Sequence, residues 1–160
     1  MTTSDELLGT SIVRVTSAPG RAKLVGLPLT ARQVPMGVGD EVAAHYKLAE
    51  GRFEPMATTL DYLVGATVAC LAGTLGGRLG ALGQSTADGE LTAEGTGSLV
   101  VDGGVIRVQA IHVVYTLALG EGVDEAKARR AHEVHARYCP VARSIGGCVE
   151  ITSEITLRNG

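Results

Sequence analysis

Three cysteines carry the most reactive side chains of this chain: Cys70, Cys139 and Cys148. A thiolate attacks electrophilic oxygen and sulfur, passes through reversible oxidation states and binds soft metal ions. An odd number of cysteines fits poorly with the disulfide framework of a small secreted protein. Each thiol is therefore a candidate for one of three roles: packing in the core, binding a metal ion, or reacting.

Cys139 lies where a helix is expected to break. It precedes Pro140, and the run from His135 to Arg143 places two arginines and a histidine near it in sequence. If Pro140 begins a new helical turn, the helix dipole favours a thiolate at Cys139. The same residue could equally fill a corner between two helices, and the local sequence does not separate the two interpretations.

The other two cysteines have surroundings that favour packing over reaction. Cys70 lies in the middle of a long apolar run, with no cation within one helical turn of it. Free cysteine is among the most buried residue types, so a reactive Cys70 requires a cation from elsewhere in the fold. Cys148 follows Gly146-Gly147 and begins the last expected strand, which favours a structural role.

Two histidines have a spacing that could hold a metal ion. His132 and His135 are one helical turn apart and Cys139 is one turn further, so a zinc site completed by Cys148 is an alternative. The spacing is not one of the usual structural zinc patterns. A histidine on an amphipathic, charged helix is more often a solvated surface residue.

Composition excludes several classes of function. The chain has 160 residues, which suits a single domain over 1–160, and a net charge of −3 argues against a protein that grips nucleic acid. The N-terminus lacks a secretory signal, and the low-charge run from Tyr62 to Gly77 is too short and too rich in glycine and threonine to span a bilayer. We therefore expect a cytoplasmic protein that binds neither nucleic acid nor membrane.

The first third of the chain predicts strands and turns, followed by a long helix. Short strands are expected at residues 11–16, 22–25 and 27–30, a loop at 36–40, and either strand or loop at 42–46. A helix begins at Thr58 or Thr59, and its apolar residues keep helical spacing as far as Leu82. Its many glycines predict close packing against another backbone and a position at the buried centre of the fold.

The remainder of the chain predicts two strands, a helix and a last strand. Strands at residues 92–101 and 105–117 are joined by Asp102-Gly103-Gly104, a good hairpin turn. A helix capped by Asp124 runs to Tyr138, Cys139-Pro140 breaks it, and a short helical turn follows through Ile145. Residues 148–157 alternate as a strand. The order is typical of an α+β fold.

Two segments resemble the OsmC/Ohr family of hydroperoxide resistance proteins. The first is LDYLVGATVAC, which ends at Cys70, and the second is YCPVARSI, which contains Cys139. The resemblance extends from about Ser11 to Leu157, and the order of elements matches. It implies an OsmC-like fold, an intertwined homodimer and a thiol-dependent peroxidase that reduces organic hydroperoxides.

The resemblance also implies roles for the two thiols. Cys70 looks like the peroxidatic thiol that is oxidised to a sulfenic acid, and Cys139 like the resolving thiol that condenses with it to a disulfide. An external dithiol of the lipoyl type then reduces the disulfide. The family implies no metal ion and no organic cofactor. A buried apolar pocket around the helix would favour bulky organic hydroperoxides.

The family's organic-peroxide branch activates its thiolate with an arginine held by an acid. Arg21, in Gly20-Arg21-Ala22, is the best match for the arginine, and Arg32 is second. Asp61 occupies the approximate place of the acid, which is usually Glu in the family. Nine residues separate Asp61 from Cys70, about 180° around a regular helix, so Asp61 is expected to act only indirectly.

A second hypothesis comes from a different class of function. In this reading the chain is a non-catalytic OsmC-like domain that binds a small apolar ligand or a partner, and its cysteines only pack. A zinc-binding module is the third hypothesis.

Overall fold

The computed structural model describes residues 6–49 and 51–159, and the chain divides into two compact units between Thr59 and Leu60. The first unit contains the early strands and one short helix. The second contains the long helix, the three later strands and the C-terminal helices, and it carries all three cysteines. Each unit is described below by itself.

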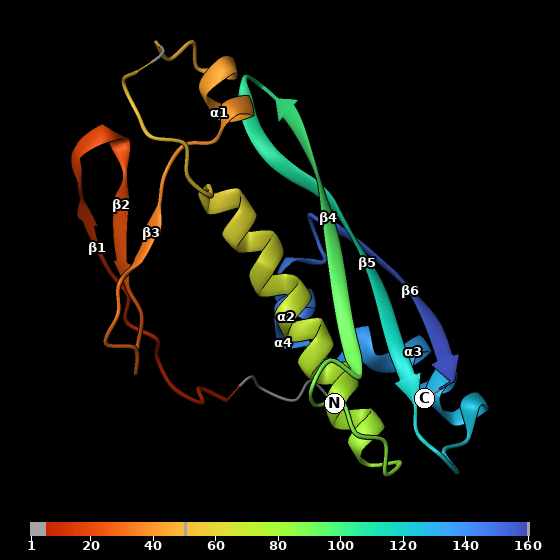
Figure 1. Cartoon of the computed structure of the whole chain (residues 1–160). Helices are drawn as coiled ribbons and strands as arrows, with labels where there is room; N and C mark the ends of the chain where they lie inside the picture. The colour runs from red at the N-terminus through yellow and green to blue at the C-terminus, as the bar shows by residue number, and fades with distance from the viewer. Residues whose placement is uncertain (1–5, 50, 160) are drawn as a thin grey trace. The chain divides into compact units, whose positions relative to one another are not determined.

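The first unit is built on a small antiparallel sheet (Figure 1). Its strands are β1 (Arg14–Ser17), β2 (Lys23–Gly26) and β3 (Val34–Met36), in the order β1-β2-β3. A single 3-10 turn, η1 (Pro19–Arg21), joins β1 to β2. The short helix α1 (Asp40–His45) follows β3. The turn therefore presents Arg21 beside the sheet.

Three expectations for this unit differ from the structure. Residues 27–30 form a turn and not a strand, because Pro28 leads into a Leu29 with a φ of 58°. Residues 42–46, expected as strand or loop, are mostly part of helix α1, which Asp40 and Glu41 stabilise at its N-terminus. Strand β3 lies in a segment for which the sequence pattern predicted no strand.

The second unit is built on a longer sheet of three strands. These are β4 (Leu91–Asp102), β5 (Val105–Leu119) and β6 (Glu150–Asn159), in the order β4-β5-β6. β4 and β5 form the predicted hairpin, whose turn consists of Gly103 and Gly104, both at positive φ. β6 pairs with β5 in parallel, so the chain must cross the sheet between them. The crossing segment carries the C-terminal helices.

One face of this sheet is covered by helices. The register places Ala93, Tyr115 and Ile155 side by side on this face. Helix α2 (Thr59–Gly80) and helix α3 (Glu125–His135) both reach it, because Val68 of α2 lies over Gly95 and His132 of α3 bonds Ser153. η2 (Ala136–Tyr138) and α4 (Pro140–Ile145) continue from α3 (Figure 1). The opposite face is polar and exposed, with Thr92, Glu94, Thr96, His112, Thr152 and Glu154.

Helix α2 lies directly on the backbone of β4. A Cβ atom at Gly95 would collide with Val68 Cγ2, and one at Gly97 would lie 2.5 Å from Val64 Cγ2, closer than real Cβ atoms approach. The absence of side chains at Gly95 and Gly97 therefore sets the distance between helix and sheet. This contact fixes the height of every α2 side chain above the sheet.

The glycines of α2 do not set the distance between the helix and the sheet. Where a Cβ would stand at Gly65, Gly73 or Gly77, no atom of the described residues lies within 4 Å. The buried residues of α2 form one stripe at a spacing of four: Thr67, Leu71, Leu75 and Leu79. The expectation that these glycines pack against another backbone is wrong for the described residues. The expectation that α2 is the buried centre of the fold stays a prediction. The close approach comes from the strand's glycines instead.

Helix α2 is also the one described helix that could cross a membrane by length and composition. It has 22 residues, and its most apolar window has a mean hydropathy of 1.3. α2 is therefore longer at both ends than the low-charge run Tyr62–Gly77, which by itself is too short to span a bilayer. The core helices of globular proteins pass the same test, and α2 packs along the sheet, so this finding is weak evidence for a membrane.

Alanine substitution of the two kinds of glycine should have opposite effects on stability. Gly95→Ala forces Val68 from its position and should lower the free energy of unfolding by about 1–3 kcal/mol. Gly77→Ala, in open space on α2, should raise it by about 0.5–1 kcal/mol because alanine is the better helix former. Urea unfolding measures both, and a neutral Gly95→Ala would contradict the close contact.

Candidate thiol site

Helix α2 presents Cys70 at the edge of its buried stripe. Cys70 is half-buried and packs against the core of the second unit. The Cys70 carbonyl oxygen accepts a hydrogen bond of 2.8 Å from Thr74 Oγ1, four residues further along α2. Cys70 therefore lies at the boundary between the apolar core and the exposed side of α2.

Cys139 is the N-cap residue of α4. Its backbone is extended between η2 and α4, and Pro140 takes the first helical position, as the sequence predicts. The Ala142 N–H donates to Cys139 Sγ at 3.5 Å, and the side chain is completely buried. The thiol is thus held by the helix end and enclosed by the core.

Cys70 and Cys139 come from different helices, and Cys70 lies near enough to Cys139 to affect its pKa. Burial raises the pKa of Cys139 above its ordinary value, and interaction with Cys70 raises it further, against the N–H groups of Ala142 and Val141. The expectation that the helix end favours a thiolate at Cys139 is therefore reversed by burial, and Cys139 keeps its proton.

A chain of buried polar side chains lies next to this pair. Tyr115 Oη and His135 Nε2 are 3.0 Å apart, and His135 Nδ1 donates to the His132 carbonyl oxygen. His132 Nε2 lies 3.0 Å from Ser153 Oγ. Tyr115 and His135 are both completely buried. The expectation that the histidines of this helix are solvated is therefore wrong for His135.

The sequence did contain a signal for the burial of His135. Ala128, Ala131 and His135 follow the spacing of one helical face, and all three are buried in α3. Tyr115 had no comparable signal, because its partner depends on the register of β5 under α3. The charged residues around His135 belong to the opposite, exposed face of the same helix.

Burial also shifts the pKa values of this chain of side chains. It raises the pKa of the Tyr115 phenol, and the nearby Cys139 raises it further. It lowers the pKa of His135, and the Arg78 cation adds to this effect against the hydrogen bond to His132. It lowers the pKa of His132 as well, together with His135 and against Glu133. Both histidines are therefore held neutral.

The four side chains proposed for zinc do not assemble. Within residues 6–49 and 51–159, no group of three or more His, Cys, Asp and Glu is arranged to hold a metal ion. Both ring nitrogens of His135 already have partners. Cys148 is exposed, and its Sγ donates to the Ile145 carbonyl oxygen at 3.3 Å.

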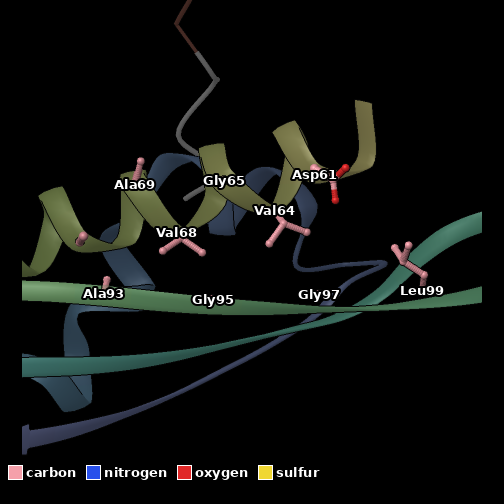
Figure 2. A pocket seen from close by; sticks show the side chains of 10 residues that line it. Asp61, Val64, Gly65, Val68, Ala69, Ala93, Gly95, Gly97 and Leu99 are labelled. Carbon is pink, nitrogen blue, oxygen red and sulfur yellow. The ribbon is translucent and has the colours of Figure 1, made fainter. Parts of the chain in front are cut away.

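Asp61 lies away from the sulfurs. It lines a cavity of about 620 Å³ between α2 and β4, with walls that include Val64, Val68, Gly97 and Leu99 (Figure 2). Because α2 is continuous from Thr59 to Gly80, the nine residues between Asp61 and Cys70 turn them to opposite sides of the helix. The cavity is open to solvent and includes the Asp61 carboxyl in its wall, so it is not the buried apolar pocket that was expected, and Cys70 is not among the residues that line it.

The two arginines belong to the other unit. Arg21 has a φ of 67° in turn η1 and lines a cavity of about 370 Å³ together with Lys47 and Arg52. Arg32 is exposed in the loop before β3. Both lie in the first unit and both thiols in the second. The pairing of Arg21 with Cys70 stays a prediction.

The family described as OsmC-like protein matches residues 53–154 of this chain, which include Cys70, Cys139 and Asp61. Among curated proteins, none matches this chain in sequence.

Solved structures share the fold at low sequence identity. The organic hydroperoxide resistance protein OhrB of Bacillus subtilis is 18% identical with a TM-score of 0.64, over 94% of this chain and 100% of that one. An organic hydroperoxide resistance protein from Elizabethkingia anophelis is 17% identical with a TM-score of 0.67, over 98% and 100%. An OsmC-like protein of unknown function from Vibrio cholerae is 13% identical with a TM-score of 0.75, over 93% and 100%.

The lowered pKa values of His132 and His135 should make the fold sensitive to mild acid. Both are easier to protonate after unfolding, so the unfolded chain binds more protons below about pH 6.5. The free energy of unfolding should therefore decrease as pH falls from 7 to 5.5, by at most about 1.4 kcal/mol per pH unit for each histidine. Urea unfolding at the two pH values measures the change.

A histidine on the other face of the sheet provides the matched control. His112 is exposed and hydrogen-bonds Thr152. The His112→Gln variant should show the same decrease in the free energy of unfolding at low pH as the wild type. A double variant, His132→Gln with His135→Gln, should reduce it. Equal sensitivity of the wild type and the double variant would contradict the assignment.

Proposed function

The chain belongs to the OsmC-like family, and from this premise we propose that it is a thiol-dependent peroxidase that reduces organic hydroperoxides. The observation that carries the proposal is that Cys70 and Cys139, from different helices, lie near enough for Cys70 to raise the pKa of Cys139. Two nearby thiols can form a disulfide where their Cβ atoms come within about 3.5–4.5 Å. Packing alone does not require two cysteines from separate helices to lie close together.

The proposed reaction has two thiol steps. The Cys70 thiolate attacks the distal oxygen of the hydroperoxide, the O–O bond breaks, and the departing alkoxide takes a proton and leaves as an alcohol. Cys70 is then a sulfenic acid. Cys139 attacks its sulfur, the S–O bond breaks, and water leaves as the disulfide forms. An external dithiol, suspected to be of the lipoyl type, reduces the disulfide.

The environments of the sulfurs support this division of roles. Cys70 is half-buried, whereas Cys139 is completely buried. Cys139 also has a raised pKa and so remains a thiol in the reduced protein, a poor nucleophile until Cys70 has been oxidised. The two solved organic hydroperoxide resistance proteins share the fold of this chain, and this supports organic hydroperoxides as the proposed substrate class.

Further parts of the proposal are an intertwined homodimer, which the resemblance to the family implies, and a cytoplasmic location without nucleic-acid or membrane partners, which charge and composition favour. We assign the activating cation to Arg21 and give Asp61 an indirect role. Arg21 is favoured over Arg32 by its backbone, because a positive φ in a residue other than glycine is uncommon and such strain gathers at functional sites.

The cavity beside α2 supports a second candidate function. It has about 620 Å³ of space, apolar walls and no contribution from Cys70. A non-catalytic domain that binds a small apolar ligand would need such a cavity and no reactive thiol. The two candidates differ in whether loss of Cys70 affects the consumption of hydroperoxide.

Substitution of single cysteines should separate the candidates. Cys70→Ser should abolish the consumption of cumene hydroperoxide in the presence of excess dithiol, because no sulfenic acid can form. Cys139→Ser should allow one turnover without a disulfide, and Cys148→Ser is the matched control with normal activity. Stopped-flow absorbance measures the rates, and equal rates for Cys70→Ser and the wild type would leave the ligand-binding function.

Substitution of the arginines tests the source of the positive charge. Arg21→Gln should slow the oxidation of Cys70 by at least roughly tenfold, as expected when a charge that stabilises a thiolate is lost. Arg32→Gln should have no effect. Single-turnover formation of sulfenic acid in the Cys139→Ser protein measures the step. The opposite pattern would assign the cation to Arg32.

A further inference from the structure

Another cavity of the second unit lies between the C-terminal end of α2 and one face of α3. It has a volume of about 350 Å³, and it is called the α2–α3 cavity below. Its lining combines small and aliphatic side chains with three cations: Ala81, Leu82, Ala131, Val134, Arg78, Lys127 and Arg130. The proposed peroxidase reaction uses none of these residues.

The apolar walls of the α2–α3 cavity are continuous with the core. Ala131 is buried, and Val134 is half-buried one turn further along the same face of α3. Leu82 follows the end of α2 and remains exposed. An alkyl chain in the cavity would therefore remove from water apolar surface that the protein's own side chains leave uncovered.

The three cations differ in whether a carboxylate already neutralises them. Arg130 Nη1 lies 2.6 Å from Glu133 Oε2, so its charge is paired. Among residues 6–49 and 51–159, no carboxylate forms an ion pair with Arg78 or Lys127. No acidic residue of the described chain lines the cavity. Two uncompensated positive charges thus border one small apolar cavity, which favours an anion there.

An aromatic ring orients the Arg78 side chain. The guanidinium carbon of Arg78 lies 4.0 Å from the centroid of the Tyr138 ring. Stacking of this kind holds a guanidinium in place while its N–H donors remain available at its edge. Such a group binds a carboxylate through two parallel hydrogen bonds and loses little conformational freedom in doing so.

We propose that the α2–α3 cavity binds a medium-chain aliphatic carboxylate, with its carboxylate at Arg78 and Lys127 and its alkyl chain against the apolar walls. Small-molecule sites are typically apolar cavities of this size with a few convergent polar groups. A small inorganic anion would leave the walls uncovered, and a neutral hydrocarbon would leave the two cations unpaired. Neither Cys70 nor Cys139 lines the cavity, so the inference goes beyond the proposed function.

Titration of octanoate into the full-length protein tests the site. In protein with ¹³C-labelled leucine and valine methyl groups, the NMR signals of Leu82 and Val134 should shift in a saturable way, which gives the dissociation constant. Acetate has the charge without the chain, and 1-octanol has the chain without the charge. Each should bind at least about tenfold more weakly than octanoate, because each lacks one of the two interactions.

Substitutions separate the contribution of charge from that of shape. Arg78→Gln should weaken octanoate binding by roughly tenfold, as expected when a hydrogen bond to a charged group is lost. Lys127→Gln should weaken it by about two- to fivefold, the range for exposed ion pairs. Ala81→Trp should fill the cavity and abolish binding. Arg129→Gln is the matched control with wild-type affinity, because Arg129 pairs with Glu125 and does not line the cavity.

The site would be overturned by any of four results. These are no saturable binding of octanoate to the wild type, equal affinities for octanoate and 1-octanol, wild-type affinity in both Arg78→Gln and Lys127→Gln, and shifts confined to methyl groups elsewhere, such as that of Val64. Circular dichroism checks the fold of each variant, and Lys127 is exposed, so Lys127→Gln tests the charge even if Arg78→Gln unfolds. Cys70→Ser should bind octanoate like the wild type, so failure of the peroxidase proposal and failure of this site are separate outcomes.

Discussion

The depth at which α2 lies on the sheet depends on two glycines of β4. Gly95 and Gly97 leave room for Val68 and Val64, and this sets the distance between the helix and the sheet. Cys70 is on α2, while Cys139 is the N-cap residue of α4, where Pro140 takes the first helical position. The proposed disulfide therefore involves a helix whose height above the sheet is set by two strand residues.

The burial that joins the sulfurs also makes them unequal. Cys139 is enclosed and its pKa is raised, while Cys70 remains partly open to solvent. In a solvent-exposed pair the two thiols would compete for the same oxidant. Here the enclosed thiol is protected from the oxidant and is a weak nucleophile until its neighbour changes. Enclosure therefore gives an order to the two steps of the proposed reaction.

Local patterns predicted the elements that depend on local interactions. The long helix from Thr59, the Gly103-Gly104 hairpin and the Asp124 cap are confirmed, since each is encoded within a few residues. Helix α1 and strand β3 were not identified, because both are short and lack strong periodicity. The proximity of the thiols was expected only from the resemblance to a family. Helix and strand periodicities relate residues a few positions apart, so they cannot predict that two residues so far apart in sequence lie close together.

The hydrogen bond between Tyr115 and His135 could not be predicted from the sequence. Its existence depends on which residue of β5 lies under α3, and that register is a property of the whole sheet. A misplaced partner would leave a phenol or an imidazole unsatisfied in the core, at a cost of about 1–3 kcal/mol. The core is therefore stable only with both partners in place, and the same requirement fixes the tautomer of His135.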